Sequence, residues 1–207
     1  MPLIRATGAV DDPWLFVRDE EPLPETGAVI VTLQRFQANR DQLLARATPL
    51  GVRLKSDQAP SLIAGDIERF DVIALEFPKF TDGRAYSAAR LLRERYGYRG
   101  ELRAVGNVLR DQLAFMRRCG FDSYEIRDGV DTAAWITALG GISVVYQPAT
   151  DGRASALALR HSIGRNVTSP YPSPASGRGD SNERVAQSIE QVAQSSPLSH
   201  GSGRGPG

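Results

Sequence analysis

The stretch Val72–Gly97, VIALEFPKFTDGRAYSAARLLRERYG, contains one complete strand-to-helix unit. It begins with the apolar, β-branched run VIALEF, which is typical of a strand in a parallel sheet. A run at helical spacing follows, in which the apolar residues are Ala85, Ala88, Ala89, Leu92 and Tyr96. Thr81 or Asp82 can cap the start of this helix, and Gly97 can end it.

The same alternation recurs on both sides of this unit, from about Val29 to Gln147. Strands are expected at residues 29–33, 52–54, 72–77, 101–105, 123–126 and 142–147, with helical patterns between them. Such βα repeats predict an α/β protein with a mostly parallel sheet of about six strands, either open or curled as a partial barrel.

The remainder of the chain divides into two further regions. Residues 1–28 read as an N-terminal arm, in which Trp14 and Phe16 pair along an edge strand or cover one mouth of the sheet. The α/β domain is expected over residues 29–160. Residues 161–207 are rich in Ser, Pro and Gly, which predicts a disordered tail, with one short amphipathic helix in ERVAQSIEQVAQ at 183–194.

Composition excludes several classes of protein. The 25 Lys and Arg residues nearly balance the 24 Asp and Glu residues, so binding to nucleic acid or to an anionic membrane is not expected. Cys119 is the only cysteine, and both histidines come late, which argues against a disulfide, a metal centre or a His-based triad. Cys119 is expected to be a small core residue, because no base lies near it in the sequence. The first residues do not resemble a signal peptide, and a cytoplasmic protein is expected.

In a parallel sheet the loops that follow the strands open at one edge, and helix N-termini point towards it. An anion is therefore favoured at this edge. The candidate catalytic residues are Asp82 and Glu76. The candidate anion-binding residues are Arg84, Arg103, Arg153 and Lys79, and the candidate orienting residues are Tyr86, Asn107, Asp111 and Gln112. Each of these residues also has a purely structural interpretation as a cap or a solvated surface group.

Two features of the sequence each allow two interpretations. TDGRAYSAAR at 81–90 and TDGRASALALR at 150–160 share their first five residues. In one interpretation the shared motif is only a favourable helix start. In the other it marks two equivalent strand-to-helix connections, which present Arg84 and Arg153 on the same side of the sheet. Arg103, within ELRAV, lies at an edge or on the solvent face. In a curled sheet it would instead form a buried ionic layer with Glu101 or reach a ligand.

The common cofactor motifs are missing. The sequence has no dinucleotide fingerprint after its first predicted strand, and it has no Walker loop, nucleophile elbow, HExxH or CxxC motif. It therefore identifies no cofactor. Acid–base catalysis would depend on Glu76, Asp82, Asp111 or Tyr86, without a histidine.

The run Phe77–Ile126 contains FPKFTDGRAYS, GYRGELRAVG, VLRDQ and CGFDS in this order. With these motifs, roughly residues 30–150 resemble a bacterial domain family of unknown function. Its members are commonly encoded beside sulfite reductase and other genes of assimilatory sulfate reduction, and they are often labelled probable oxidoreductases. The resemblance implies a role in sulfite reduction, and hence in cysteine biosynthesis, with sulfite reductase as a partner.

Three hypotheses follow. The first is an accessory protein of assimilatory sulfite reduction that binds a small oxyanion or sulfite reductase itself. The second is a small barrel-like enzyme that acts on a phosphorylated or carboxylated metabolite, with Asp82 or Glu76 as the base and Arg84 as the anion clamp. The third is a structural module that forms a homodimer, because six βα units are fewer than the eight of a closed barrel and leave a sheet edge uncovered.

Overall fold

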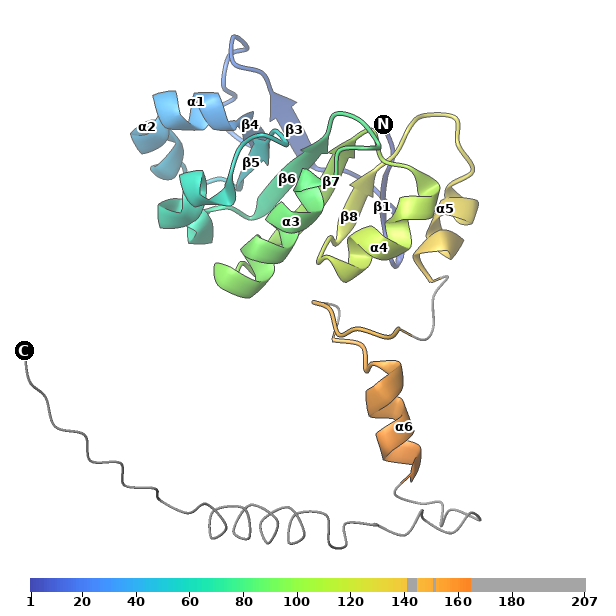
Figure 1. The fold of residues 1–207 in the computed structure, drawn as a ribbon. Coiled ribbons are helices and arrows are strands. Elements are labelled where there is room, and N and C mark those ends of the chain that lie inside the picture. The colour runs from blue at the N-terminus through green and yellow to red at the C-terminus, as the bar shows by residue number, and fades with distance from the viewer. Residues whose placement is uncertain (141–144, 151, 165–207) are drawn as a thin grey trace, which may run out of the picture. The chain divides into compact units, whose positions relative to one another are not determined.

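The computed structural model of the chain describes residues 1–140, 145–150 and 152–164 (Figure 1). Met1–Arg160 form one compact unit. The last described helix, α6, spans Ala156–Gly164. Most of the predicted tail, including the predicted helix at 183–194, lies outside the described residues.

The unit is built on an eight-stranded sheet of order β2-β1-β8-β7-β6-β5-β4-β3. The strands are β1 (Leu3–Arg5), β2 (Gly8–Val10), β3 (Trp14–Val17), β4 (Ala28–Thr32), β5 (Leu50–Leu54), β6 (Val72–Phe77), β7 (Glu101–Gly106) and β8 (Ser123–Glu125). Strands β3 to β8 are parallel and follow one another in chain order. The antiparallel hairpin β1–β2 is added beside β8. The predicted α/β class and mostly parallel sheet are confirmed, with eight strands where about six were expected.

Residues 1–28 contribute three strands to the sheet, because β1, β2 and β3 all lie within them. The edge-strand interpretation of Trp14 and Phe16 is confirmed, since both lie in β3 beside β4. The strand predicted at 142–147 is not found in its described part, where Val145 makes only an isolated parallel bridge to Ser155.

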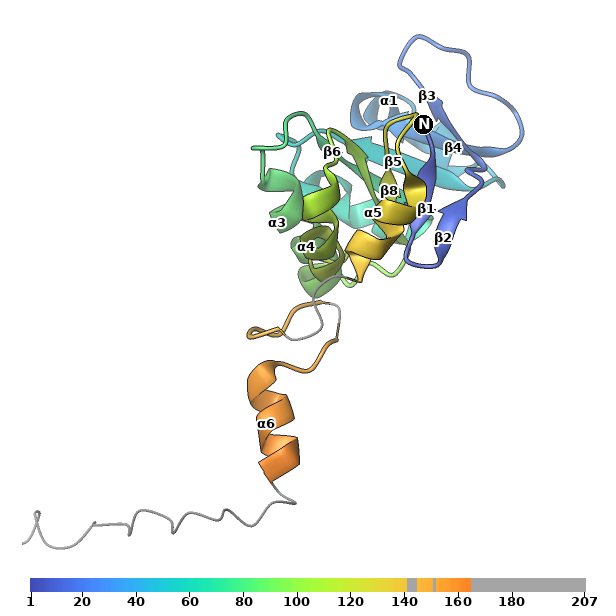
Figure 2. The same ribbon diagram turned by 90° about the vertical axis from the view of Figure 1, so that its right-hand side faces the viewer.

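The sheet is curled into a half-barrel, and the short link between β2 and β3 requires this. These two strands are the opposite edges of the sheet, yet only Asp11–Pro13 separate them in the chain. Such a link reaches at most about 14 Å, counted from Val10 to Trp14. The edges of a flat sheet of this size would be roughly 30 Å apart. Curling brings the two edges close enough for the link to join them (Figure 2).

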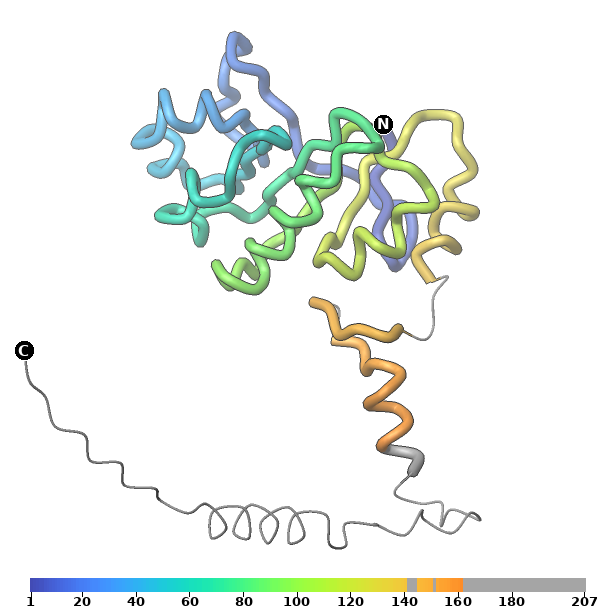
Figure 3. Tube along the Cα trace, in the orientation of Figure 1, coloured from blue at the N-terminus to red at the C-terminus, as the bar shows by residue number. Residues whose placement is uncertain are grey.

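Helices cover one face of the sheet (Figures 1 and 2). They are α1 (Leu33–Ala38), α2 (Arg40–Leu44), the 3-10 helix η1 (Pro60–Arg69), α3 (Arg84–Arg90), the π-helical turn η2 (Leu91–Arg95), the 3-10 turn η3 (Arg110–Gln112), α4 (Leu113–Arg118) and α5 (Thr132–Leu139). The trace in Figure 3 shows the chain alternating between extended and coiled segments. The strand side chains that face the helices are apolar, including Val31, Val52, Ile73 and Leu102, and they form the main core.

The unit at 72–97 forms largely as its sequence predicts. Gly83 is the N-cap of α3 and makes no side-chain cap bond. Asp82 takes over the predicted capping role, because its Oδ1 accepts the backbone N–H of Arg84 at 3.2 Å. Gly97 ends the helical run with a φ of 66°, a left-handed conformation that favours glycine.

The concave face of the sheet is different in character. A small apolar cluster of Ile30, Val72, Ala74 and Val105 lies there, with Trp14 and Phe16 packed against it. The strand positions that alternate with the helix-facing core residues also include charged ones, notably Arg53, Glu76, Glu101 and Arg103. The half-barrel therefore has an apolar outer face beneath its helices and a partly ionic inner face.

Candidate functional site

A pocket of about 330 Å³ lies where strands β3 to β6 end. Its lining residues are Phe16, Arg18, Asp19, Thr32, Gln34, Arg53, Lys55, Gln58 and Glu76. In parallel α/β architectures the carboxyl ends of the strands are the edge at which ligands bind. We call this cavity the rim pocket.

Arg53 and Glu76 project from the neighbouring strands β5 and β6, and each side chain is about one quarter exposed. Arg53 Nε donates to Glu76 Oε2 at 3.3 Å, and its guanidinium carbon lies 4.9 Å from the centre of the Phe16 ring. A guanidinium over an aromatic face is held by a cation–π attraction in addition to its ion pair. The carboxylate of Glu76 is thus already engaged by the protein.

The loop after β3 forms another wall of the pocket, and Arg35 holds it in place. Arg35 Nη1 donates to the carbonyl oxygens of Arg18 and Glu21, the latter at 2.6 Å. Thr32 Oγ1 caps α1 by accepting the backbone N–H of Arg35 at 3.1 Å, and it donates to the carboxylate of Asp19. Both acidic groups of the pocket, Asp19 and Glu76, therefore accept hydrogen bonds from the protein.

Two cations at the mouth of the pocket are not engaged in this way. The side chains of Arg18 and Lys55 are exposed, and neither makes a hydrogen bond or ion pair with the described part of the chain. The backbone N–H of Lys55 donates to Gln58 Oε1 at 2.8 Å, which orders the loop after β5. The pocket thus offers two available positive charges beside two acids that already accept hydrogen bonds from the protein, of which Glu76 is also ion-paired.

The predicted residues Asp82 and Arg84 form a second cluster on the same edge. Arg84 donates to Asp82 through Nε at 3.0 Å and Nη2 at 2.7 Å, and Nη2 also donates to Ser56 Oγ at 2.9 Å. These bonds, first of all those from Arg84, hold the pKa of Asp82 well below its usual range. A carboxylate with a lowered pKa is a weaker base, so this pair resembles an anchor between two loops more than a proton acceptor.

Three of the four predicted orienting residues, Tyr86, Gln112 and Asn107, have protein partners in the structure. Tyr86 packs between Phe77 and Phe115, with ring centroids 5.1 and 4.9 Å away, and burial raises its pKa to about 12. Gln112 Nε2 donates to the carbonyl oxygen of Phe80 at 3.0 Å, and Arg127 Nη2 donates to Asn107 Oδ1 at 3.1 Å. Lys79 and Asp111 are exposed and do not line the rim pocket.

Arg103 is not at an edge or on the solvent face, because β7 is a central strand and the residue is only 3% exposed. The interpretation as a buried ionic layer is correct. Arg103 Nε donates to Glu101 Oε1 at 3.1 Å and Nη1 donates to Asp12 Oδ2 at 2.6 Å. Glu101 also accepts bonds from Ser123 Oγ at 2.6 Å and from Arg5.

Arg153 is not on the same side of the sheet as Arg84, so the interpretation of TDGRA as two equivalent corners is wrong. Arg84 lies near Ser56 at the carboxyl ends of the strands, whereas Arg153 lines a different cavity next to Gly120 and Asp122, which precede β8. The physical reason is that the second motif follows no sheet strand within the described residues.

Sequence reasoning missed several residues that line the rim pocket, namely Phe16, Arg18, Asp19, Thr32, Gln34, Arg53 and Gln58. Three of these belong to the segment interpreted as an arm. A signal for Arg53 was present, because it is the charged residue in VRL, and strand alternation places it opposite Val52 and Leu54. An edge strand at Trp14 and Phe16 was expected, but no local pattern indicated that its neighbour would be β4.

Within residues 1–140, 145–150 and 152–164, no group of three or more His, Cys, Asp or Glu side chains is placed to hold a metal ion. None of the helices in this part of the chain has the length and apolar character needed to span a bilayer. The fold and the rim pocket define an α/β protein of the half-barrel type. The family model for bacterial proteins of unknown function (DUF934) matches residues 51–157, just over half of the sequence, and the chain belongs to this family. A comparison with curated proteins finds no match.

Proposed function

We propose that the chain is a cytoplasmic accessory protein of assimilatory sulfite reduction, and that its rim pocket binds a small sulfur oxyanion. The observation that carries this proposal is the pair of available cations, Arg18 and Lys55, in a pocket whose acids are already hydrogen-bonded. An oxyanion would accept charge-assisted hydrogen bonds from both side chains without having to displace a carboxylate.

The electrostatics of the edge support the same ligand. Arg53 adds a third positive group to the lining of the pocket, and its side chain remains one quarter exposed despite the ion pair with Glu76. The neighbouring Arg84 is 59% exposed despite its pairing with Asp82. The assignment to sulfite reduction rests on the resemblance to proteins encoded beside sulfite reductase, and it makes sulfite the first ligand to test.

Isothermal titration calorimetry with sulfite and with sulfate tests the proposal. Lys55→Gln and Arg18→Gln are each expected to weaken binding about tenfold, because each removes one hydrogen bond to a charged group. Lys79→Gln is the matched control, since Lys79 is exposed on the same edge but does not line the pocket. Absence of sulfite binding, or an equal loss in the Lys79 variant, would contradict the proposal.

The partner can be tested separately. Tagged protein is expected to retain sulfite reductase from an extract of cells that were grown on sulfate. An extract of cells that were grown on cysteine serves as the control. Failure to retain the enzyme would remove the direct partnership and leave the oxyanion site to be judged by calorimetry.

One observation favours the enzyme hypothesis as a second candidate. Glu76 lies inside the rim pocket with Lys55, whereas Asp82 is tied to Arg84. Glu76 is therefore the better candidate base for a phosphorylated or carboxylated substrate. Glu76→Gln is expected to remain folded and to lose turnover, while Asp82→Asn keeps it. The opposite result would assign the chemistry to the Asp82 cluster.

A further inference from the structure

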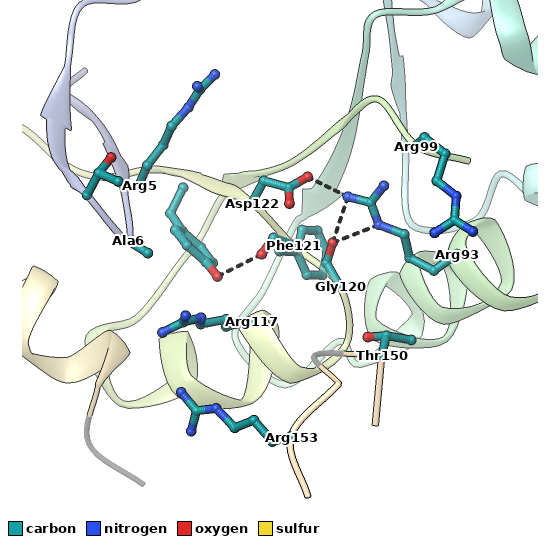
Figure 4. Close-up of a pocket in the computed structure, with 12 residues that line it drawn as sticks. Arg5, Ala6, Arg93, Arg99, Arg117, Gly120, Phe121, Asp122, Thr150 and Arg153 are labelled. Atoms are coloured by element: carbon teal, nitrogen blue, oxygen red, sulfur yellow. Dashed lines mark hydrogen bonds and ion pairs between the residues drawn. The ribbon is translucent and has the colours of Figure 1, made fainter. Parts of the chain in front are cut away.

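A larger cavity, of about 590 Å³, lies at the opposite ends of the strands (Figure 4). It is bounded by the turn between β1 and β2, the π-helical turn η2, helix α4 and the residues that precede β7 and β8. Five of its lining residues are arginines, namely Arg5, Arg93, Arg99, Arg117 and Arg153. Among the described residues that line this cavity, Asp122 is the acidic one. We call it the arginine cavity.

Arg93 has a structural task in this cavity. Its Nε and Nη2 donate to the carbonyl oxygen of Gly120 at 3.1 and 3.0 Å, and its Nη1 donates to those of Tyr98 and Gly100 at 2.8 and 2.9 Å. It also pairs with Asp122, which accepts the backbone N–H of Leu102 at 2.8 Å. The one acid that lines the cavity is thus occupied by Arg93 and by the backbone.

Three of the other arginines, Arg99, Arg117 and Arg5, are weakly engaged or partly exposed. Arg99 is exposed and makes no hydrogen bond or ion pair with the described residues. Arg117 Nη1 reaches the carbonyl oxygen of Leu139 only at 3.4 Å. Arg5 pairs with Glu101, yet its side chain remains 44% exposed. Several like charges that share one cavity repel one another, so a bound anion relieves an unfavourable interaction as well as forming a favourable one.

The rest of the wall offers little to a cation. Tyr124 is buried, and its hydroxyl donates to the carbonyl oxygen of Phe121 at 3.1 Å. Thr150 Oγ1 donates to the carbonyl oxygen of Arg118 at 2.6 Å. Gly120 has a φ of 106°, and a Cβ there would lie 2.7 Å from Arg93 Cγ, so only glycine lets the Arg93 side chain lie against this turn. The groups left for a ligand are mainly guanidinium N–H donors.

The positive groups are spread over the cavity. In Figure 4 the side chains of Arg117 and Arg153 extend on one side and those of Arg93 and Arg99 on the other. A volume of 590 Å³ is in the range that holds a drug-sized ligand, so a single small oxyanion would reach only some of these groups. Guanidinium groups bind phosphate and sulfo oxygens in bidentate fashion.

We propose that the arginine cavity binds a small molecule that carries two or more phosphate or sulfo groups. Two anionic groups on one ligand let arginines on both sides of the cavity engage at once. The site is separate from the rim pocket, which lies at the other ends of the strands, and it does not depend on the function proposed for that pocket.

The test is calorimetry on the full chain, with inorganic pyrophosphate as the probe and orthophosphate as the comparison. Pyrophosphate is expected to bind at least tenfold more tightly than orthophosphate, and its affinity is expected to fall as salt is raised. The double variant Arg99→Gln/Arg117→Gln is expected to weaken pyrophosphate binding at least tenfold. Arg95→Gln is the matched control, because Arg95 is an exposed arginine of η2 that does not line the cavity.

Three outcomes would overturn the proposal: no binding of pyrophosphate by the unaltered chain, equal affinity for orthophosphate, or an equal loss in the Arg95 variant. Lys55→Gln is expected to leave pyrophosphate binding unchanged, and a loss there would place the ligand in the rim pocket. If the double variant fails to fold, as judged by circular dichroism, Arg99→Gln alone decides. Its side chain makes no hydrogen bond or ion pair with the described residues, and a loss of less than threefold would count against the site.

Discussion

Asp12 and Arg103 are 91 positions apart in the sequence, yet Asp12 Oδ2 accepts a hydrogen bond of 2.6 Å from Arg103 Nη1. This bond joins the link between the two sheet edges to the central strand β7. The Arg103 side chain is only 4% exposed, whereas that of Asp12 is 33% exposed. A buried guanidinium requires such partners, because an unpaired charge in the interior is strongly unfavourable.

Arg103→Met is therefore expected to destabilise the fold by about 3 kcal/mol, since it leaves Glu101 in the interior without its buried partner. Asp12→Asn is expected to cost less, about 1 kcal/mol, because Arg103 keeps Glu101 and the amide can still accept a hydrogen bond. Urea unfolding measures both values. Arg95→Met, on an exposed side chain, is the control, and a cost for Arg103→Met no larger than for this control would refute the role of the ionic layer.

The pairing of Asp82 with Arg84 makes a signed prediction about pH. Because these bonds lower the pKa of Asp82 in the folded state, the pair contributes stability above the ordinary carboxyl pKa of about 3.9. That contribution is lost as the pH falls below this value. The melting temperature of Asp82→Asn is expected to lie below that of the unaltered chain at pH 7, and the gap is expected to narrow below pH ~4. Asp111→Asn, on an exposed side chain, is expected to show no such trend, and a constant gap for Asp82→Asn would contradict the pairing.

Tyr86 makes the opposite prediction, at alkaline pH. Burial raises its pKa to about 12, so the neutral phenol is favoured in the folded state, and its contribution is lost as the pH rises from about 10 towards 12. Tyr86→Phe is expected to change stability at pH 7 by less than about 0.5 kcal/mol, because the phenol makes no hydrogen bond with the described residues. Above pH 10 this variant is expected to lose stability more slowly than the unaltered chain. Thermal melts between pH 10 and pH 12 measure this difference. If the two proteins lose stability equally over this range, the Tyr86 ring is not buried as described.

Cys119 is expected to be unreactive in the folded protein. It is 4% exposed, and burial raises the pKa of its thiol, so little reactive thiolate is available at neutral pH. A chromogenic disulfide reagent is expected to label Cys119 at least a hundredfold more slowly in buffer than in 6 M guanidinium. A slowing of roughly this size is expected because labelling in buffer requires the opening of a stable fold. Rapid labelling in buffer would contradict its interpretation as a core residue.

Much of the fold was predictable because its signals are local. The run VIALEF and the stripe that includes Ala85, Ala89 and Leu92 each show the period of one element, and their alternation predicts parallel βα units. The short strands β1 and β2 give no comparable signal, because three residues show no periodicity and β8, with which β1 pairs, is far away in the chain.

The candidate site was predictable only where it depends on βα corners. Glu76, Asp82 and Arg84 lie at the expected edge because each is close to the end of one parallel strand. Arg18 and Phe16 were missed because they enter the rim pocket only through the pairing of β3 with β4. Arg153 was misplaced because a helix-start motif carries no information about which edge of the sheet it will meet.

The sequence by itself determined the α/β class, the parallel order implied by repeated βα units, and membership in a bacterial family. Only the tertiary structure decided that Asp11–Pro13 join the two edges of a curled sheet, that Arg103 is buried against Asp12, and that five arginines surround one cavity. The reason is physical. Periodicity and capping act over a few residues and are visible in any window, whereas curling, ion pairing and cavity formation depend on which distant segments meet.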